Sequence, residues 1–250
     1  DTIFGSVTTT DKVIIELLHH KVMTRLKGID QHGPQTYWLH APTFDRYTHS
    51  VGVYALLKKY GAPLKEQVAG LLHDASHTVF SHLADRFFQT GNEYAYQDQV
   101  HEWFLEKMGV DKVLSKYGYD IDEMAPELYP RLKAKLPGLC ADRIEYNMEA
   151  ALASGRLSHA EVDRVMADLR HEDNTWFFTT QESAKTFAVQ AEHYCRHDLA
   201  SALNTMHHHW MVSAMRQLVA RDLITSEDIQ DRKSTRLNSS HLVISYAVFC

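Results

Sequence analysis

Three histidines and one aspartate fall within the run from Leu72 to His82, and this string constrains the chain more than any other feature. It reads Leu-His-Asp-Ala-Ser-His-Thr-Val-Phe-Ser-His and directly follows an apolar stretch with helical spacing. Imidazole nitrogens and carboxylate oxygens form a ligand set suited to Mn, Fe, Mg, Ni, Co or Zn. The string therefore predicts one divalent metal ion bound near the end of a helix.

Two further strings carry the same kinds of side chain. They are Arg46-Tyr47-Thr48-His49-Ser50-Val51-Gly52-Val53 upstream and Cys140-Ala141-Asp142-Arg143-Ile144-Glu145-Tyr146 downstream. Two histidines and two aspartates, drawn from the three strings, would make one metal site. A site with four such ligands leaves coordination positions for water and substrate, as metal-assisted hydrolysis requires.

The order His, His-Asp, Asp resembles the HD-domain superfamily of metal-dependent phosphohydrolases. The strings Arg-x-x-His-Ser-x-Gly-Val and His-Asp-x-x-His-x-x-Phe-Ser-His are similar to the branch that contains deoxynucleoside triphosphate triphosphohydrolases and related bacterial hydrolases. A lone His-Asp pair would be weak support, but three linked strings in the family's order are specific. The resemblance implies an all-α HD helical bundle with a minor β element.

The expected metal ligands are His49, His73, Asp74 and Asp142. Adjacent helical residues point about 100° apart, so His73 and Asp74 can share an ion only if it lies between helices. Asp142 would close the site from a distant helix. The alternative is that both histidines are hydrogen-bonded core residues and that Asp142 caps a helix.

The resemblance assigns His77 and His82 to the phosphate side of the site, and with Asp74 they are the expected catalytic residues. His77 is expected one helical turn after His73, facing the same cleft. An imidazolium there would stabilise charge that develops on the leaving oxygen. The alternative for each is a surface histidine or one that supports the metal ligands.

Three residues are expected to contact the substrate, namely Gln31, Arg46 and Tyr146. Arg46 precedes His49 by three residues on the same helical face, where a guanidinium suits a pair of phosphate oxygens. Its alternative is a salt bridge to a nearby carboxylate. In the family, the position that matches Gln31 contacts the sugar or the base, and the position that matches Tyr146 touches the sugar.

The chain departs from the triphosphohydrolase pattern in two places. Where the family has Tyr-x-x-Arg-Asp, the matching stretch of this chain begins at Tyr146 and ends with Glu149 and Ala150. Ala150 therefore replaces a sugar-recognising aspartate. Where the family has a catalytic His-Glu, this chain has Tyr96-Gln97-Asp98, with His101-Glu102 one turn on. Both departures weaken the case for deoxynucleoside triphosphate specificity, and neither touches the metal ligands.

Bulk composition narrows the class of protein further. The formal net charge of −6 argues against nonspecific nucleic-acid binding. The three cysteines show no metal-binding or disulfide spacing, which favours a reducing compartment and a cytoplasmic protein. No apolar run approaches the ~20 residues needed to span a bilayer, so no membrane association is expected. A homo-oligomer stays open.

The chain is expected to form one HD domain over residues 1–230, with its core motifs at 46–146. Helices are expected at 11–26, from 47 to 60, at 64–73, from 79, from 94, at 140–154, after a capping box at Ser158 and Glu161, at 181–196 and at 199–220, with short strands at 37–39 and 176–179. Residues 231–250 match nothing in the family, and we interpret them as a non-native read-through tail. The alternative is a natural tail that packs as a strand.

The expected function is metal-dependent hydrolysis of a phosphate ester or anhydride, with a nucleotide as substrate. One alternative is a catalytically silent HD module that binds a nucleotide or a partner for regulation, since such a protein could keep its ligands and lose its substrate residues. The other is a diiron oxygenase of the same fold. That enzyme needs extra histidine ligands between His82 and Asp142, where only His101 is available.

Overall fold

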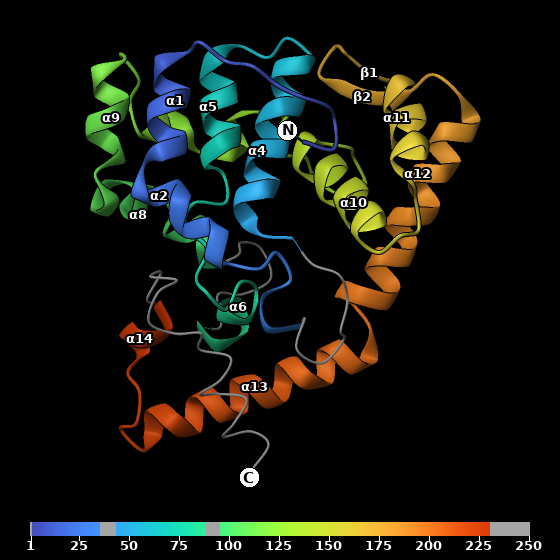
Figure 1. Ribbon diagram of the computed structural model, residues 1–250. Coiled ribbons are helices and arrows are strands. Elements are labelled where there is room, and N and C mark those ends of the chain that lie inside the picture. The colour runs from blue at the N-terminus through green and yellow to red at the C-terminus, as the bar shows by residue number, and fades with distance from the viewer. Residues whose placement is uncertain (1, 36–43, 89–95, 231–250) are drawn as a thin grey trace.

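The structure, a computed structural model, describes residues 2–35, 44–88 and 96–230 (Figure 1). It confirms the predicted all-helical class with a minor β element, since one two-stranded sheet accompanies the helices. The strand predicted at residues 37–39 and the segment 231–250 lie outside the described residues. Within the described part of the chain, no helix has the length and apolar character needed to cross a membrane.

Three helices form the centre of the domain and carry the candidate site. They are α4 (Arg46–Lys59), α5 (Leu64–Leu72) and α10 (Ala141–Ala153), and α4 contacts both of the others. Asp45 caps α4, because its carboxylate accepts a hydrogen bond from the Thr48 N–H at 2.7 Å. The first turn of α4 buries the polar side chains of Arg46 and His49, which therefore need partners inside the fold.

Shorter helices cover the α5 side of this centre. They are α1 (Lys12–His19), α2 (Lys21–Thr24), α8 (His101–Met108) and α9 (Val110–Lys116). Very short elements connect the helices of the N-terminal half, namely α7 (Tyr96–Gln99) and the 3-10 helices η1 (Arg25–Gly28), η2 (Gly33–Gln35), η3 (Asp122–Met124) and η4 (Pro126–Leu128). The prediction of one continuous helix over residues 11–26 is wrong, because His20 adopts an extended backbone that ends α1. The His20 ring then accepts a hydrogen bond from the Val22 N–H at 3.2 Å and caps α2.

The minor β element is a hairpin rather than the single strand predicted at residues 176–179. β1 (Leu169–Glu172) pairs antiparallel with β2 (Thr175–Phe178). Asp173 and Asn174 between them have φ angles of 48° and 58°, the left-handed pair that a two-residue hairpin turn needs. The sequence of β1 contains no strong strand former, so only the Asp-Asn turn signalled its presence.

The C-terminal part of the domain is helical. Its elements are α11 (His159–Ala167), α12 (Gln181–His193), a π-helix (Tyr194–Leu199), α13 (Ala202–Ala220) and α14 (Ser226–Gln230). The capping box predicted at Ser158 and Glu161 is confirmed at the start of α11. The helix predicted over residues 181–196 instead changes to a π-helix after His193. α13 crosses the base of the molecule and packs on α6 (Leu83–Phe88), as Figure 1 shows.

The histidine-rich string forms turns between α5 and α6 rather than a helix. α5 ends at Leu72, and the helix predicted from residue 79 begins only at Leu83. The prediction that His77 lies one helical turn beyond His73 is therefore wrong. The turns after α5, rather than a helix, set the position of the His77 side chain.

A buried arginine fixes the backbone of these turns. The Arg25 guanidinium donates hydrogen bonds to the carbonyl oxygens of Ala75 at 2.8 Å and His77 at 2.5 Å. The same guanidinium lies 5.1 Å from the centre of the Phe104 ring. Carbonyl groups that would otherwise be left without partners in a buried turn are satisfied in this way.

Candidate metal centre

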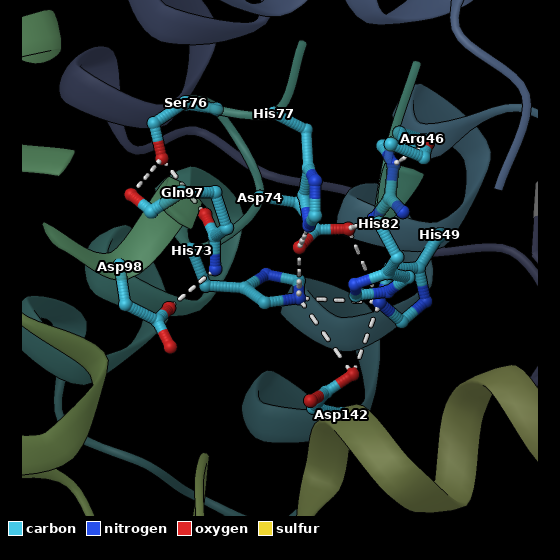
Figure 2. Close-up of polar contacts among 12 residues, drawn as sticks. Arg46, His49, His73, Asp74, Ser76, His77, His82, Gln97, Asp98 and Asp142 are labelled. Carbon is cyan, nitrogen blue, oxygen red and sulfur yellow. Dashed lines mark hydrogen bonds and ion pairs between the residues drawn. The ribbon is translucent and has the colours of Figure 1, made fainter. Parts of the chain in front are cut away.

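The four predicted metal ligands come together where α4, α5 and α10 meet (Figure 2). They are His49 in the first turn of α4, His73 and Asp74 directly after α5, and Asp142 in the first turn of α10. One ligating atom from each of His49, His73 and Asp74 lies within 4.8 Å of the others. Figure 2 shows Asp142 closing the group from α10.

The contact distances define a small polar space between these side chains. His49 Nε2 lies 3.1 Å from His73 Nε2 and 3.2 Å from Asp142 Oδ1. His73 Nε2 lies 3.6 Å from Asp74 Oδ1 and 3.8 Å from Asp142 Oδ1. Two nitrogens and two carboxylates therefore face one point, as the ligands of a metal ion do.

The ring orientations decide which histidine nitrogen faces that point. His73 Nδ1 lies 2.8 Å from the Gly70 carbonyl oxygen, to which only a protonated nitrogen can donate. His49 Nδ1 contacts the Glu145 carboxylate, which likewise accepts a hydrogen bond from that nitrogen. With both Nδ1 protons engaged, the two Nε2 atoms face each other, and either a proton or a metal cation must lie between their lone pairs. A metal ion can take that place, so these residues fit a bound metal.

Carboxylates dominate the charge around this point. Burial alone would raise the pKa of Asp74, but Arg46 and the neighbouring histidines hold it well below its usual range. Burial also opposes ionisation of Asp142, yet hydrogen bonds from the ligand histidines lower its pKa. Burial would lower the pKa of His49, but the surrounding carboxylates, Glu145 first, raise it to about 10. The accumulated negative charge favours a cation.

Each guanidinium nitrogen of Arg46 contacts a protein acceptor. Its side chain is 1% exposed, and its Nη1 lies 2.5 Å from Asp74 Oδ2. Its Nε donates to Ser81 Oγ at 3.0 Å, and its Nη2 donates to the Gln31 carbonyl oxygen at 3.0 Å. The salt bridge that we considered as the alternative is thus present, and it holds Asp74 in place.

His77 and His82 stand beside Asp74 in different environments. His77 is buried, with its Nε2 3.2 Å from Asp74 Oδ1. Burial and the charge of Arg46 lower the pKa of His77 to about 3, which disfavours the expected imidazolium and favours a neutral hydrogen-bond donor. The His82 side chain is exposed, with its ring centre 5.1 Å from that of His77 and its Nδ1 3.1 Å from Asp85 Oδ2.

A cavity of about 420 Å³ opens over this group. The residues predicted from the sequence that border it are Gln31, Arg46, His73, Asp74, His77, His82, Asp142 and Tyr146, while His49 lies fully buried behind them. Residues that the sequence did not single out also border it, among them Arg86, Lys133 and Tyr194. Its size lies within the range of about 300–1,000 Å³ that is typical of small-molecule sites.

Ala150, which we matched to the family's sugar-recognising aspartate, lies among buried aromatic side chains. Ala150 belongs to a small apolar cluster with Phe44 and Tyr194. Tyr146 packs at the edge of this cluster, with its ring centre 5.8 Å from that of Tyr194. The methyl group of Ala150 therefore has no polar role that could replace the missing carboxylate.

Glu149, next to Ala150, gives stability a measurable pH dependence. Burial and the nearby charge of Glu145 raise the pKa of Glu149 from 4.5 to about 7. The folded state then holds this proton more tightly than the unfolded chain, so stability falls as the pH rises through that interval. Glu149→Gln should remove the fall and gain about 2 kcal/mol over the wild type near pH 8, after allowance for partial exposure, with no gain near pH 4. Urea unfolding at both pH values checks this, and equal gains would contradict it.

Glu145 is a buried partner of the candidate site that the sequence analysis missed. It is 0% exposed, and its carboxylate contacts His49 Nδ1. Gly52 faces it on α4, and an added Cβ there would lie 2.7 Å from the Glu145 carboxyl carbon. A carboxylate behind a ligand histidine fixes the ring and raises its basicity. The available signal was spacing, because Gly52 follows His49 and Glu145 follows Asp142 by three residues each.

Gln97 and Asp98 belong to the segment that we matched to the family's catalytic His-Glu pair, and they lie on the His73 side of the site (Figure 2). Ser76 Oγ donates to Gln97 Oε1 at 2.8 Å and lies 3.0 Å from His101 Nδ1. Burial lowers the pKa of His101 to about 4. In residues 2–35, 44–88 and 96–230, no second group of metal ligands that includes His101 is found.

Comparison with known proteins agrees with this geometry. Residues 46–123 match the model of the HD domain family, and this stretch holds His49, His73 and Asp74. The helical fold with its minor β element is consistent with an HD helical domain. The chain belongs to the HD-domain superfamily.

Two curated relatives extend the similarity beyond the matched domain. The metal-dependent phosphohydrolase cns2 of Cordyceps militaris is 35% identical over 170 residues, which are 68% of this chain and 49% of the relative. The uncharacterized protein YdhJ of Bacillus subtilis is 29% identical over 240 residues, which are 95% of this chain and 73% of the relative. The chain thus spans about half the length of the first of these relatives.

Solved structures share the fold. A hypothetical protein from Aquifex aeolicus matches with a TM-score of 0.70 and 17% identity, covering 98% of this chain and 69% of that one. A phosphohydrolase from Bacteroides thetaiotaomicron matches with a TM-score of 0.66 and 18% identity, covering 89% of this chain and 59% of that one. At such identities the likeness concerns the fold alone.

Proposed function

We propose that this protein is a metal-dependent phosphohydrolase and that its substrate is a nucleotide. The observation that carries the proposal is the convergence of two histidine nitrogens and two carboxylates at a cavity of about 420 Å³. Membership of the HD superfamily and similarity to a metal-dependent phosphohydrolase support the same reaction class.

In this proposal each residue of the site has a defined task. The residues that would hold the ion are His49, His73, Asp74 and Asp142. A bound divalent ion supplies Lewis-acid chemistry, because it polarises a phosphate oxygen and lowers the pKa of water. Arg46 orients Asp74, His77 donates a hydrogen bond to the same carboxylate, and His82 at the exposed edge is the candidate proton donor to the leaving oxygen.

Three residues of the cavity wall support a nucleotide as the substrate. Tyr146 and Tyr194 present aromatic rings on which a base can stack. Gln31 also borders the cavity, and its buried Oε1 has no hydrogen-bond partner among the described residues. An amide oxygen in this position suits a donor group on a base or a sugar.

The test is a screen of purified protein against nucleoside mono-, di- and triphosphates with Mn, Mg, Ni and Co. Hydrolysis of at least one nucleotide, dependent on the added metal and absent after chelation, is the expected result. Hydrolysis that is confined to phosphate esters without a base would retain the reaction class and reject the nucleotide. Inactivity with every metal and substrate would favour the second candidate.

The second candidate is a silent HD module that binds a nucleotide for regulation. The observation that favours it is the apolar cluster of Phe44, Ala150 and Tyr194 in place of a substrate carboxylate. Such a module would bind nucleotides with the same metal dependence without turning them over. Calorimetric titration of metal-loaded protein with the nucleotides of the screen separates the two.

We expect weak discrimination between ribo- and deoxyribonucleotides. Strong rejection of one sugar needs a buried polar group that the wrong substrate leaves unpaired, and Ala150 supplies none. The ratio of kcat/KM for matched pairs should therefore stay below about tenfold. A ratio above about a hundredfold would show that another residue, such as Gln31, reads the hydroxyl.

A further inference from the structure

We infer that Lys133 binds the phosphate group of the substrate, and that Asp98 positions its ammonium for this purpose. The inference rests on the proposed function and deepens it. The sequence favoured Arg46 for this role, and the structure gives Arg46 other partners.

The charges around the cavity leave few candidates for this contact. Three side chains that are always or ordinarily cationic border it, namely Arg46, Arg86 and Lys133. Arg46 is enclosed by protein acceptors, as described above. Arg86 is an exposed residue of α6. Lys133 is the third cation, and its side chain is only 34% exposed, as suits a group held in the cavity wall.

The backbone holds Lys133 close to a metal ligand. The preceding residue, Leu132, borders the cavity, and its carbonyl oxygen accepts the Asp142 N–H at 3.4 Å. The Arg131 carbonyl oxygen accepts the Ala141 N–H at 2.8 Å. These two bonds tie the turn that carries Lys133 to the first turn of α10. A phosphate that is bound at the metal ligands therefore lies beside this turn.

Two carboxylates direct the ammonium. Lys133 Nζ lies 2.9 Å from Asp98 Oδ2 and 2.7 Å from Glu127 Oε1. Asp98 borders the cavity and lies on the His73 side of the ligand group in Figure 2. Lys133 thus bridges from the turn beside Asp142 to the residue beside His73, across one wall of the cavity.

This arrangement keeps Lys133 charged and leaves it a donor. Burial alone would lower its pKa, but the two carboxylates raise it. An ammonium group has three donors, and two are used by Asp98 and Glu127. The third can reach a phosphate oxygen, and charge-assisted bonds of this kind are among the strongest in proteins. The neutral glutamine side chain of Gln97 contacts the other oxygen of Asp98 and fixes it.

The experiment compares Lys133→Gln with Lys133→Arg and with Lys135→Gln, a control at an exposed lysine of the same turn. Manganese-loaded proteins are titrated calorimetrically with inorganic phosphate, and KM and kcat are measured for the best nucleotide from the screen. We expect Lys133→Gln to weaken phosphate binding and to raise KM by about 10- to 100-fold. Lys133→Arg should recover most of this loss, and the control should match the wild type.

Metal content and melting temperature of every variant separate this inference from other causes. Unchanged phosphate affinity and KM in Lys133→Gln would overturn it, even where the melting temperature falls, because a purely structural ion pair would give that result. A wild type that binds phosphate through Lys133 but hydrolyses nothing would support the inference and reject the proposed reaction. If the wild type hydrolyses nucleotides and Lys133→Gln leaves phosphate binding and KM unchanged, the proposed reaction is supported and the inference about Lys133 is rejected.

Discussion

His73→Ala and Asp142→Ala will each abolish stoichiometric metal binding and reduce nucleotide hydrolysis by more than about a hundredfold. This loss exceeds the one expected when only a hydrogen-bond partner of a metal ligand is removed. Each change removes one of the atoms that face the centre of the site. The lone pairs and carboxylates that remain then lack the geometry to hold a divalent ion. Elemental analysis and steady-state rates measure these two losses, and far-ultraviolet circular dichroism checks that the fold is retained.

A matched control keeps this result specific. His209→Ala removes an exposed histidine of α13 that borders none of the cavity over the metal ligands. Its metal content and rate should equal those of the wild type. Helical content should be unchanged in all three variants, because the ligands line a cavity rather than fill the apolar core. Equal metal content in His73→Ala and the wild type would refute the assignment of the site.

The convergence of the four candidate ligands could be predicted because each lies at a helix end that the sequence marks. Asp45 caps the helix of His49, the apolar stretch before His73 ends at that residue, and Asp142 follows a break near Gly138. Helical spacing and the order of the strings then leave few ways to bring imidazoles and carboxylates together. Local signals of this kind act within a few residues, and a single sequence displays them.

The partners of these ligands could not be predicted in the same way. The contact of Glu145 with His49 joins residues far apart in the chain, and so does the bond of Lys133 to Asp98. No local pattern distinguishes Glu145 from an ordinary helical glutamate or Lys133 from a surface lysine. The partners of Arg46 could not be predicted for a related reason, because its burial against Asp74 depends on turns that the sequence suggested were helical.

The fold shows the same division between local and tertiary signals. The helix positions α4, α5 and α10 followed from apolar spacing and caps, and these elements lie close to their predicted bounds. The change to a π-helix at Tyr194 has no local signal of that kind. It coincides with the contact of the Tyr194 hydroxyl with the His32 ring and with the place of Tyr194 in the cavity wall. Widened helical turns often occur at functional sites.

Gly52→Ala will weaken metal binding by about 10- to 100-fold although residue 52 touches no substrate, because its methyl group would displace the carboxylate that orients His49. A glycine in the middle of a helix normally costs about 0.5–1 kcal/mol relative to alanine, so the same change elsewhere would stabilise the protein. Here the added Cβ would lie 2.7 Å from the Glu145 carboxyl carbon, and one of the two must move.

A double-mutant cycle tests this reason directly. In the Glu145→Ala background the space beside residue 52 is empty, so Gly52→Ala should now stabilise the fold by about 0.5–1 kcal/mol and cause no further loss of metal affinity. Glu145→Ala alone should weaken metal binding by a similar factor to Gly52→Ala, since each frees the His49 ring. Urea unfolding and competition with a chelator measure the two quantities in all four proteins. Additive effects on metal affinity would show that Gly52 and Glu145 act independently, and the account of how His49 is held would then be wrong.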